Sequence, residues 1–128
     1  MKKILLIFTV FLSVNLFAQN LYFEAFKDVR KAKKVIKTDP EKAQRLFIEA
    51  YSYLKQLVNN SINNNKPSAN SFTLLGNMYL NGWGVDKNED EAIKLLCGAK
   101  ILGSRKAAKE LRKIGAKCKK INFKELKQ

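Results

Sequence analysis

The residue types that most often carry catalytic chemistry are scarce in this chain of 128 residues. It contains no histidine, which removes histidine-based catalytic triads, histidine metal sites and the commonest general base. Its two cysteines, Cys97 and Cys118, have no other soft ligand to complete a zinc site. We therefore expect neither a metal ion nor a cofactor.

One short pattern matches an enzyme motif. Ser52 and Lys55 have the Ser-x-x-Lys spacing of serine β-lactamases, in which the serine is the nucleophile. A pattern this short matches often by chance, and neither partner motif, Ser-Asp-Asn or Lys-Thr-Gly, occurs in the chain. Both residues also fall on the polar side of a predicted helix. We therefore predict no catalytic residue from this pattern.

Gly82-Trp83-Gly84 holds the single tryptophan of the chain. The lysine and hydroxyl residue that follow the glycines of a phosphate-binding loop are absent, and no predicted strand precedes the cluster. Glycine tolerates positive φ, so the cluster predicts a tight turn between two helices. Trp83 either packs on a neighbouring loop or is exposed for a partner.

The N-terminal end has the pattern of a secretory signal peptide. Two lysines follow the initial methionine, then comes an apolar run over residues 4–12, and a small residue stands at Ala18. The apolar run falls short of the roughly 20 residues that a membrane span needs. We expect residues 1–18 to be removed after Ala18, and the mature protein to be periplasmic or secreted.

An exported protein encounters conditions that allow disulfides. An isolated pair of cysteines is then typical of a bridge, so we predict that Cys97 pairs with Cys118. Helical rise and extended-chain reach allow the segment after Gly115 to fold back along the helix that carries Cys97. The alternative is that Cys97 is a small core residue and Cys118 a free thiol.

The net charge of +14 is concentrated near the C-terminal end. Residues 94–128 contain 12 Lys and Arg against 2 acids, whereas residues 19–93 contain 11 against 9. Such a run indicates either a solvated tail or attraction to an anionic envelope surface. An exported chain whose basic end lacks interleaved aromatic residues is not expected to bind nucleic acid.

Apolar residues recur at helical spacing along most of the mature chain, with almost no strand pattern. Asp39 and Pro40 mark the start of a second helix, and Asn88 marks the start of a later one. We predict an all-α fold, a short α-solenoid of helical hairpins with about five helices after the signal peptide. The expected segments are an N-terminal hairpin at 19–60, an asparagine-rich loop at 61–71, a second hairpin at 72–103, and a capping helix with a basic tail at 104–128.

The second hairpin carries a motif at fixed offsets over about 30 residues. Its matching positions are Leu75, Gly76, Tyr79, Gly82, Gly84, Val85, Ala92, Leu95, Leu96, Ala99 and Gly103. This pattern resembles the Sel1-like repeat, a relative of the tetratricopeptide repeat, and the resemblance implies an α-solenoid. The N-terminal hairpin resembles a tetratricopeptide-type unit through its period and the sequence DPEKA.

The expected function is binding of a protein or peptide in the cell envelope, without catalysis. The binding surface is the concave face formed by the first helices of each hairpin. Candidate contact residues are Tyr22, Phe26, Asn77, Tyr79 and Trp83. The resemblance also implies an alternative, because some small exported Sel1-like proteins with disulfides are classed as β-lactamases or penicillin-binding proteins.

Overall fold

The computed structural model describes residues 20–128, so the predicted signal peptide and its cleavage site after Ala18 lie outside the described residues. Every regular element in this range is helical, and the range contains no strand. An N-terminal helix covers residues 20–35. It is followed by α2 (Pro40–Asn63), α3 (Ala69–Asn81), α4 (Glu89–Ile101), α5 (Arg105–Lys113) and the short 3-10 helix η1 (Phe123–Leu126). The prediction of a short all-α fold is confirmed.

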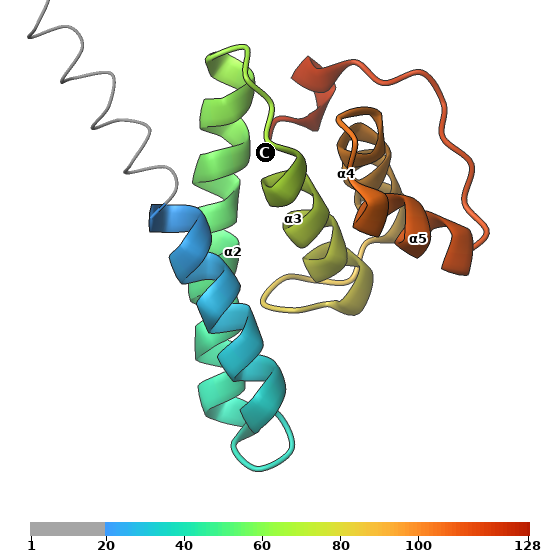
Figure 1. Cartoon of the computed structure of the whole chain (residues 1–128). Helices are drawn as coiled ribbons and strands as arrows, with labels where there is room; N and C mark the ends of the chain where they lie inside the picture. Colours follow the sequence, from blue (N-terminus) through green and yellow to red (C-terminus); the bar gives the residue numbers. More distant parts are fainter. Residues whose placement is uncertain (1–19) are drawn as a thin grey trace, which may run out of the picture.

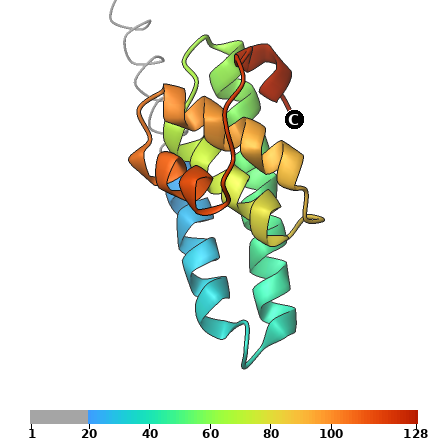
Figure 2. The same ribbon diagram turned by 90° about the vertical axis from the view of Figure 1, so that its right-hand side faces the viewer.

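The helices pack as consecutive hairpins (Figure 1). The N-terminal helix runs antiparallel to α2, and α3 runs antiparallel to α4. The short α5 packs against α4 at the far end of the array. A view from the side shows α4 and α5 in front of α3 and the N-terminal hairpin, with the C-terminal segment passing across α4 (Figure 2).

Side chains cap the start of each helix from α2 onward, accepting a hydrogen bond from a backbone N–H of the first turn. Asp39 and Asn88 do so as the sequence predicts, over 3.1 Å each. Ser68 and Ser104 cap α3 and α5 in the same way. These four caps set where each hairpin turns.

The asparagine-rich loop is shorter than the predicted range of 61–71. Helix α2 continues to Asn63 and α3 begins at Ala69, so only residues 64–68 are irregular. Ile62 explains the longer helix, because it lies one turn beyond Val58 and extends the buried stripe of α2, leaving 8% of its surface exposed. Burial of that stripe outweighs the weak helix propensity of asparagine.

Helix α3 is the central helix of the fold. All of its residues from Ser71 to Tyr79 are buried, because the N-terminal hairpin covers one side and α4 covers another. Gly76 permits the close approach of α4, since a Cβ at this position would lie 2.9 Å from Cγ of Leu96. The α3 side chains that face the side between the N-terminal helix and α5 are therefore largely buried rather than exposed to solvent.

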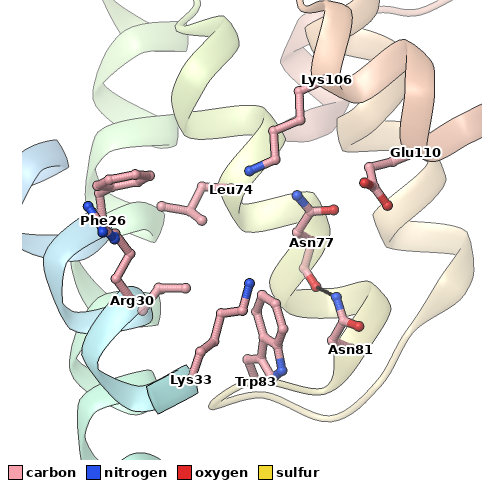
Figure 3. Close-up of a pocket in the computed structure, with 10 residues that line it drawn as sticks. Phe26, Arg30, Lys33, Leu74, Asn77, Asn81, Trp83, Lys106 and Glu110 are labelled. Atoms are coloured by element: carbon pink, nitrogen blue, oxygen red, sulfur yellow. Dashed lines mark hydrogen bonds between the residues drawn. The ribbon is translucent and has the colours of Figure 1, made fainter.

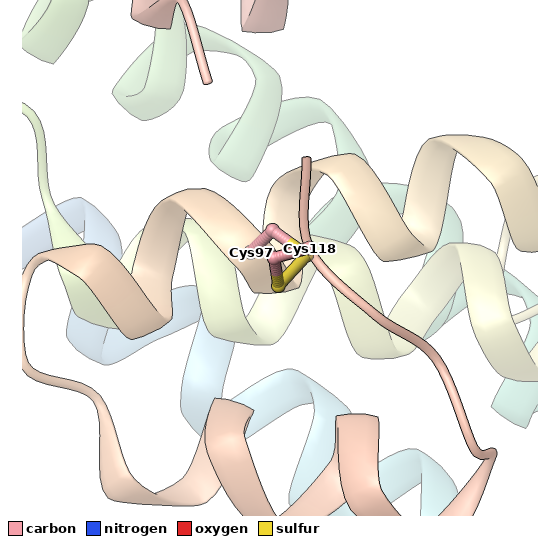
Figure 4. Close-up of a disulfide and its surroundings, with 2 residues drawn as sticks. All are labelled: Cys97 and Cys118. Carbon is pink, nitrogen blue, oxygen red and sulfur yellow. A yellow bond between two sulfur atoms is a disulfide. The ribbon is translucent and has the colours of Figure 1, made fainter. Parts of the chain in front are cut away.

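The segment after α5 is held against the fold, and we refer to residues 116–128 as the C-terminal strap. Cys97 and Cys118 form the predicted disulfide, which ties the strap to α4 (Figure 4). In η1, Leu126 is 1% exposed and packs against Gly98, and Phe123 stacks on Phe72 with ring centroids 5.9 Å apart.

The strap ends at Gln128, which joins three helices. Its backbone N–H donates to Oδ1 of Asn59 over 2.6 Å, and its side-chain amide donates to Glu91 over 3.0 Å. Its side-chain oxygen accepts from the hydroxyl of Tyr79 over 2.7 Å. The basic tail is therefore not simply a solvated run, although the lysines of the strap are exposed: Lys117, Lys119, Lys120, Lys124 and Lys127.

Candidate binding groove on the concave face

A groove of about 520 Å³ lies between the N-terminal helix, α3 and α5, and we refer to it as the concave groove (Figure 3). It is lined by Phe26, Val29, Arg30, Lys33, Leu74, Asn77, Asn81, Trp83, Lys106 and Glu110. Three helices thus contribute side chains to one hollow, and the turn after α3 adds Trp83. A volume of this order is typical of pockets that hold small molecules or peptide side chains.

Trp83 forms an aromatic wall of the groove. Its ring stacks on Phe47 of α2, with centroids 5.4 Å apart and an interplanar angle of 4°. The ammonium group of Lys33 lies 5.2 Å from its centroid, a cation–π distance. The indole therefore packs on helix α2, not on a neighbouring loop, and it also lines the groove.

Gly84 positions this wall. Its φ of +71° lies in the left-handed region that favours glycine, and a Cβ there would lie 2.5 Å from the backbone carbon and oxygen of Phe47. The turn can approach α2 this closely only because the residue has no side chain. The second glycine of Gly-Trp-Gly therefore sets the contact between the two hairpins as well as the turn itself.

Asn77 lies on the floor of the groove and is only 7% exposed. Its backbone carbonyl accepts a hydrogen bond from Nδ2 of Asn81 over 2.7 Å. Its side-chain amide makes no hydrogen bond to any of residues 20–128, and Figure 3 shows it directed into the groove. No buried side-chain nitrogen or oxygen atom within residues 20–128 lacks a hydrogen-bond partner, so the unused donors and acceptor of this amide are accessible from the groove.

The charges of the groove are mostly positive. Arg30 and Lys33 extend from the N-terminal helix, and Lys106 extends from α5 on the opposite side (Figure 3). None of the three forms a salt bridge within residues 20–128. The single carboxylate of the groove, Glu110, lies 3.6 Å from the ammonium group of Lys113. The groove therefore attracts anionic groups.

The structure brings together Phe26, Asn77 and Trp83 of the five residues proposed from the sequence for partner contact. Tyr22 stacks on Phe26 with centroids 6.2 Å apart but does not line the groove. Tyr79 does not line the groove either. Two residues along a helix rotate a side chain by about 200° relative to Asn77, which turns Tyr79 to the opposite side.

On that opposite side, Tyr79 is part of the contact between the hairpins and the strap. Its hydroxyl lies 2.9 Å from that of Tyr51 and donates to Gln128. Burial of the ring, together with the hydrogen bond to Tyr51, raises the pKa of Tyr79 above its ordinary value of 10.0. The residue therefore has a structural role in this fold.

The three cations of the groove were not among the residues predicted from the sequence. Arg30 and Lys33 stand four and seven residues after Phe26, so all three share one face of the N-terminal helix. That spacing is visible in the sequence. What is not visible is that Lys106 of α5 faces them across α3, since this depends on how the hairpins pack.

The other residues of the repeat motif are structural in this fold. Leu75, Ala92, Leu95, Leu96 and Ala99 are fully buried, and Val85 is partly buried against the core. Gly82 and Gly103 have positive φ at the ends of α3 and α4. None of these positions offers a reactive group.

The Ser-x-x-Lys pattern does not form a recognisable catalytic pair. Ser52 is exposed on α2, and the ammonium group of Lys55 lies 5.5 Å from the ring centroid of Tyr51. No hydrogen bond joins Ser52 to Lys55 in the described part of the chain.

Within residues 20–128 there is also no cluster of acidic or cysteine side chains able to hold a metal ion. None of the described helices combines the length and apolar character needed to cross a membrane.

A comparison with known proteins found no matching family model, no similar curated protein and no similar solved structure.

Proposed function

We propose that this protein is an exported binding module that captures a protein or peptide of the cell envelope in the concave groove. The observation that carries the proposal is the lining of the groove: two aromatic side chains, an accessible amide and three cations without a salt bridge in residues 20–128 meet in one hollow. Aromatic residues and arginine supply most of the binding energy in protein interfaces.

Preorganisation supports the groove as a binding surface. Trp83 is held by its stack on Phe47, and the turn that carries it is fixed against α2 by Gly84. Side chains that are already ordered lose little conformational entropy when a partner binds. A peptide would therefore meet a surface that needs little rearrangement.

We also propose that the second hairpin is a Sel1-like repeat. The support is that the motif residues serve one architecture here: the alanines and leucines are buried between helices, and the glycines occupy turns and close contacts. Repeat arrays of this kind present the first helices of their units on a concave binding face. The location of the groove agrees with that expectation.

The proposed location is the periplasm or the outside of the cell. The Cys97–Cys118 disulfide is compatible with an oxidising compartment, because such bonds persist there and are rare in the cytosol. The envelope is therefore where a partner should be sought.

Site-specific photocrosslinking tests the proposal in living cells. A photoreactive phenylalanine analogue is placed at Phe26 or Asn81 on the groove, and at the exposed Ser52 of α2 as a matched control. We expect discrete adducts with an envelope protein from the groove positions and none from Ser52. Equal adducts from all three positions, or none from any, would count against a binding groove.

A further inference from the structure

We infer that the concave groove recognises the side-chain carboxylate of an acidic residue in an extended peptide, held by Asn77, Lys106 and Arg30. This inference rests on the proposed function and names the chemistry of the ligand. It starts from Asn77, whose side-chain amide makes no hydrogen bond within residues 20–128 and is directed into the groove. Because no buried side-chain polar atom in this range lacks a hydrogen-bond partner, the amide is accessible from the groove and can donate to an acceptor on a ligand.

The groups around Asn77 favour a negatively charged acceptor. Lys106 descends from α5 with its ammonium group directed toward the same part of the groove as the Asn77 amide (Figure 3). Arg30 lies on the opposite wall, above the ring of Phe26 at 5.8 Å from its centroid. Its planar guanidinium can donate two parallel hydrogen bonds to one carboxylate, which an ammonium group cannot do.

Glu110 argues for a peptide rather than a polyanion. Its carboxylate lines the groove beside Asn77 and lies 3.6 Å from the exposed Lys113, and a phosphate polymer or an acidic polysaccharide running along the groove would meet this like charge (Figure 3). An extended peptide brings one carboxylate to the cations and can offer backbone N–H donors to Glu110. The charges of the groove therefore favour a ligand that carries a single anionic group and hydrogen-bond donors close to it.

The apolar residues of the groove indicate which kind of side chain stands next to the acidic residue in the bound peptide. Phe26 and Trp83 are partly exposed and present the apolar surface of the groove, whereas Val29 and Leu74 beside them are 4% and 5% exposed. A large apolar or aromatic side chain next to the acidic residue would cover this surface, so the preferred sequence contains such a pair.

Nuclear magnetic resonance titration tests the inference directly. The protein is expressed from the full chain, labelled with ¹⁵N and purified with its disulfide intact. The probes are N-acetyl-Phe-Asp-amide and N-acetyl-Phe-Asn-amide, which differ only in the side-chain carboxylate. The readout is the side-chain amide signal of Asn77, identified because it disappears in Asn77→Ser.

We expect the Asp probe to shift the Asn77 amide signal and to bind about tenfold more tightly than the Asn probe, the gain typical of a charge-assisted contact. Lys106→Gln and Arg30→Gln should each remove most of that difference. Lys109→Gln and Lys31→Gln are matched controls on the same two helices, at exposed positions that do not line the groove, and should leave it intact.

The outcomes separate this inference from the proposed function. If both probes bind equally and shift Trp83, the groove binds peptides but the carboxylate is not recognised, and the inference is wrong. If neither probe shifts any residue of the groove, the inference fails together with the proposed binding surface. If inorganic polyphosphate displaces the Asp probe and binds more tightly, the ligand is a polyanion and the peptide assignment is overturned.

Discussion

At the scale of single residues, Gly84 shows how a turn position can also fix the contact between two hairpins. We predict that Gly84→Ala destabilises the protein by about 3 kcal/mol, from a left-handed backbone and an overpacked contact with Phe47. Gly115→Ala is the matched control, because its φ of +67° is similar but no atom lies within 4 Å of its Cβ position. It should cost about 1 kcal/mol.

Urea unfolding followed by circular dichroism measures both free energies of unfolding. Equal losses for the two variants would show that backbone strain alone matters at Gly84. The sequence predicted a glycine turn here from residue types alone. It could not predict the contact with Phe47, because that partner belongs to another hairpin and is chosen by packing.

Tyr79 gives a second prediction, on pH dependence. Its raised pKa means that the fold favours the protonated phenol, so the resulting stability is complete below the ordinary value of 10.0 and is lost as the pH rises above it. We expect the free energy of unfolding to fall more steeply between about pH 9.5 and 11 in the wild type than in Tyr79→Phe.

The comparison with Tyr79→Phe removes the contribution of lysine ionisation, which both proteins share. Tyr79→Phe should be less stable at pH 8, since it lacks the hydrogen bonds to Tyr51 and Gln128. Its curve should then approach that of the wild type at high pH. Parallel curves over the whole range would contradict the assigned role of the phenol.

At the scale of elements, the C-terminal strap connects helices that are distant in the sequence. Its disulfide joins cysteines separated by 21 residues, and a loop of that size predicts a contribution of about 3 kcal/mol. We predict that Cys118→Ser lowers the free energy of unfolding by about this amount. The exposed Cys118 is the better position to change, because Cys97 is buried and its packing is then retained.

Reductant provides the control for the strap. Reduction of the wild type should bring its urea midpoint to that of Cys118→Ser, and reductant should not change the variant. A midpoint for Cys118→Ser equal to that of the oxidised wild type would mean that the bridge does not stabilise the fold.

The sequence predicted some elements better than others, for physical reasons. Helices with strong caps and apolar periods, such as α4 after Asn88, were predictable because the signals are local. The C-terminal end of α2 was not, because asparagines disfavour a helix that tertiary burial of Ile62 stabilises. Helix η1 was also missed, since it depends on Leu126 packing against Gly98 and Phe123 packing against Phe72.

At the scale of the whole molecule, the two faces of α3 make different contacts. One face packs against α4 and, through Phe72 and Tyr79, against the strap, while the other forms the floor of the concave groove at Leu74 and Asn77. The sequence predicted a concave face from the order of hairpins, and three of the residues proposed for it, Phe26, Asn77 and Trp83, line the groove. It did not predict the basic walls, because these form only when the N-terminal helix and α5 face each other across α3.

Export of the whole chain is the last prediction, because the proposed envelope partner could be reached only outside the cytosol and a disulfide is favoured there. When the full chain is expressed in a bacterium, we expect the mature protein to begin at Gln19, in the periplasm or medium, with Cys97 and Cys118 joined. Mass spectrometry of the intact protein, with and without reduction and alkylation, measures the N-terminus and the bond together. A version that begins at Gln19 after an added methionine should remain in the cytosol with both thiols alkylated without prior reduction. Recovery of the uncleaved chain from the cytosol in the first experiment would contradict export and remove the envelope as the source of the partner.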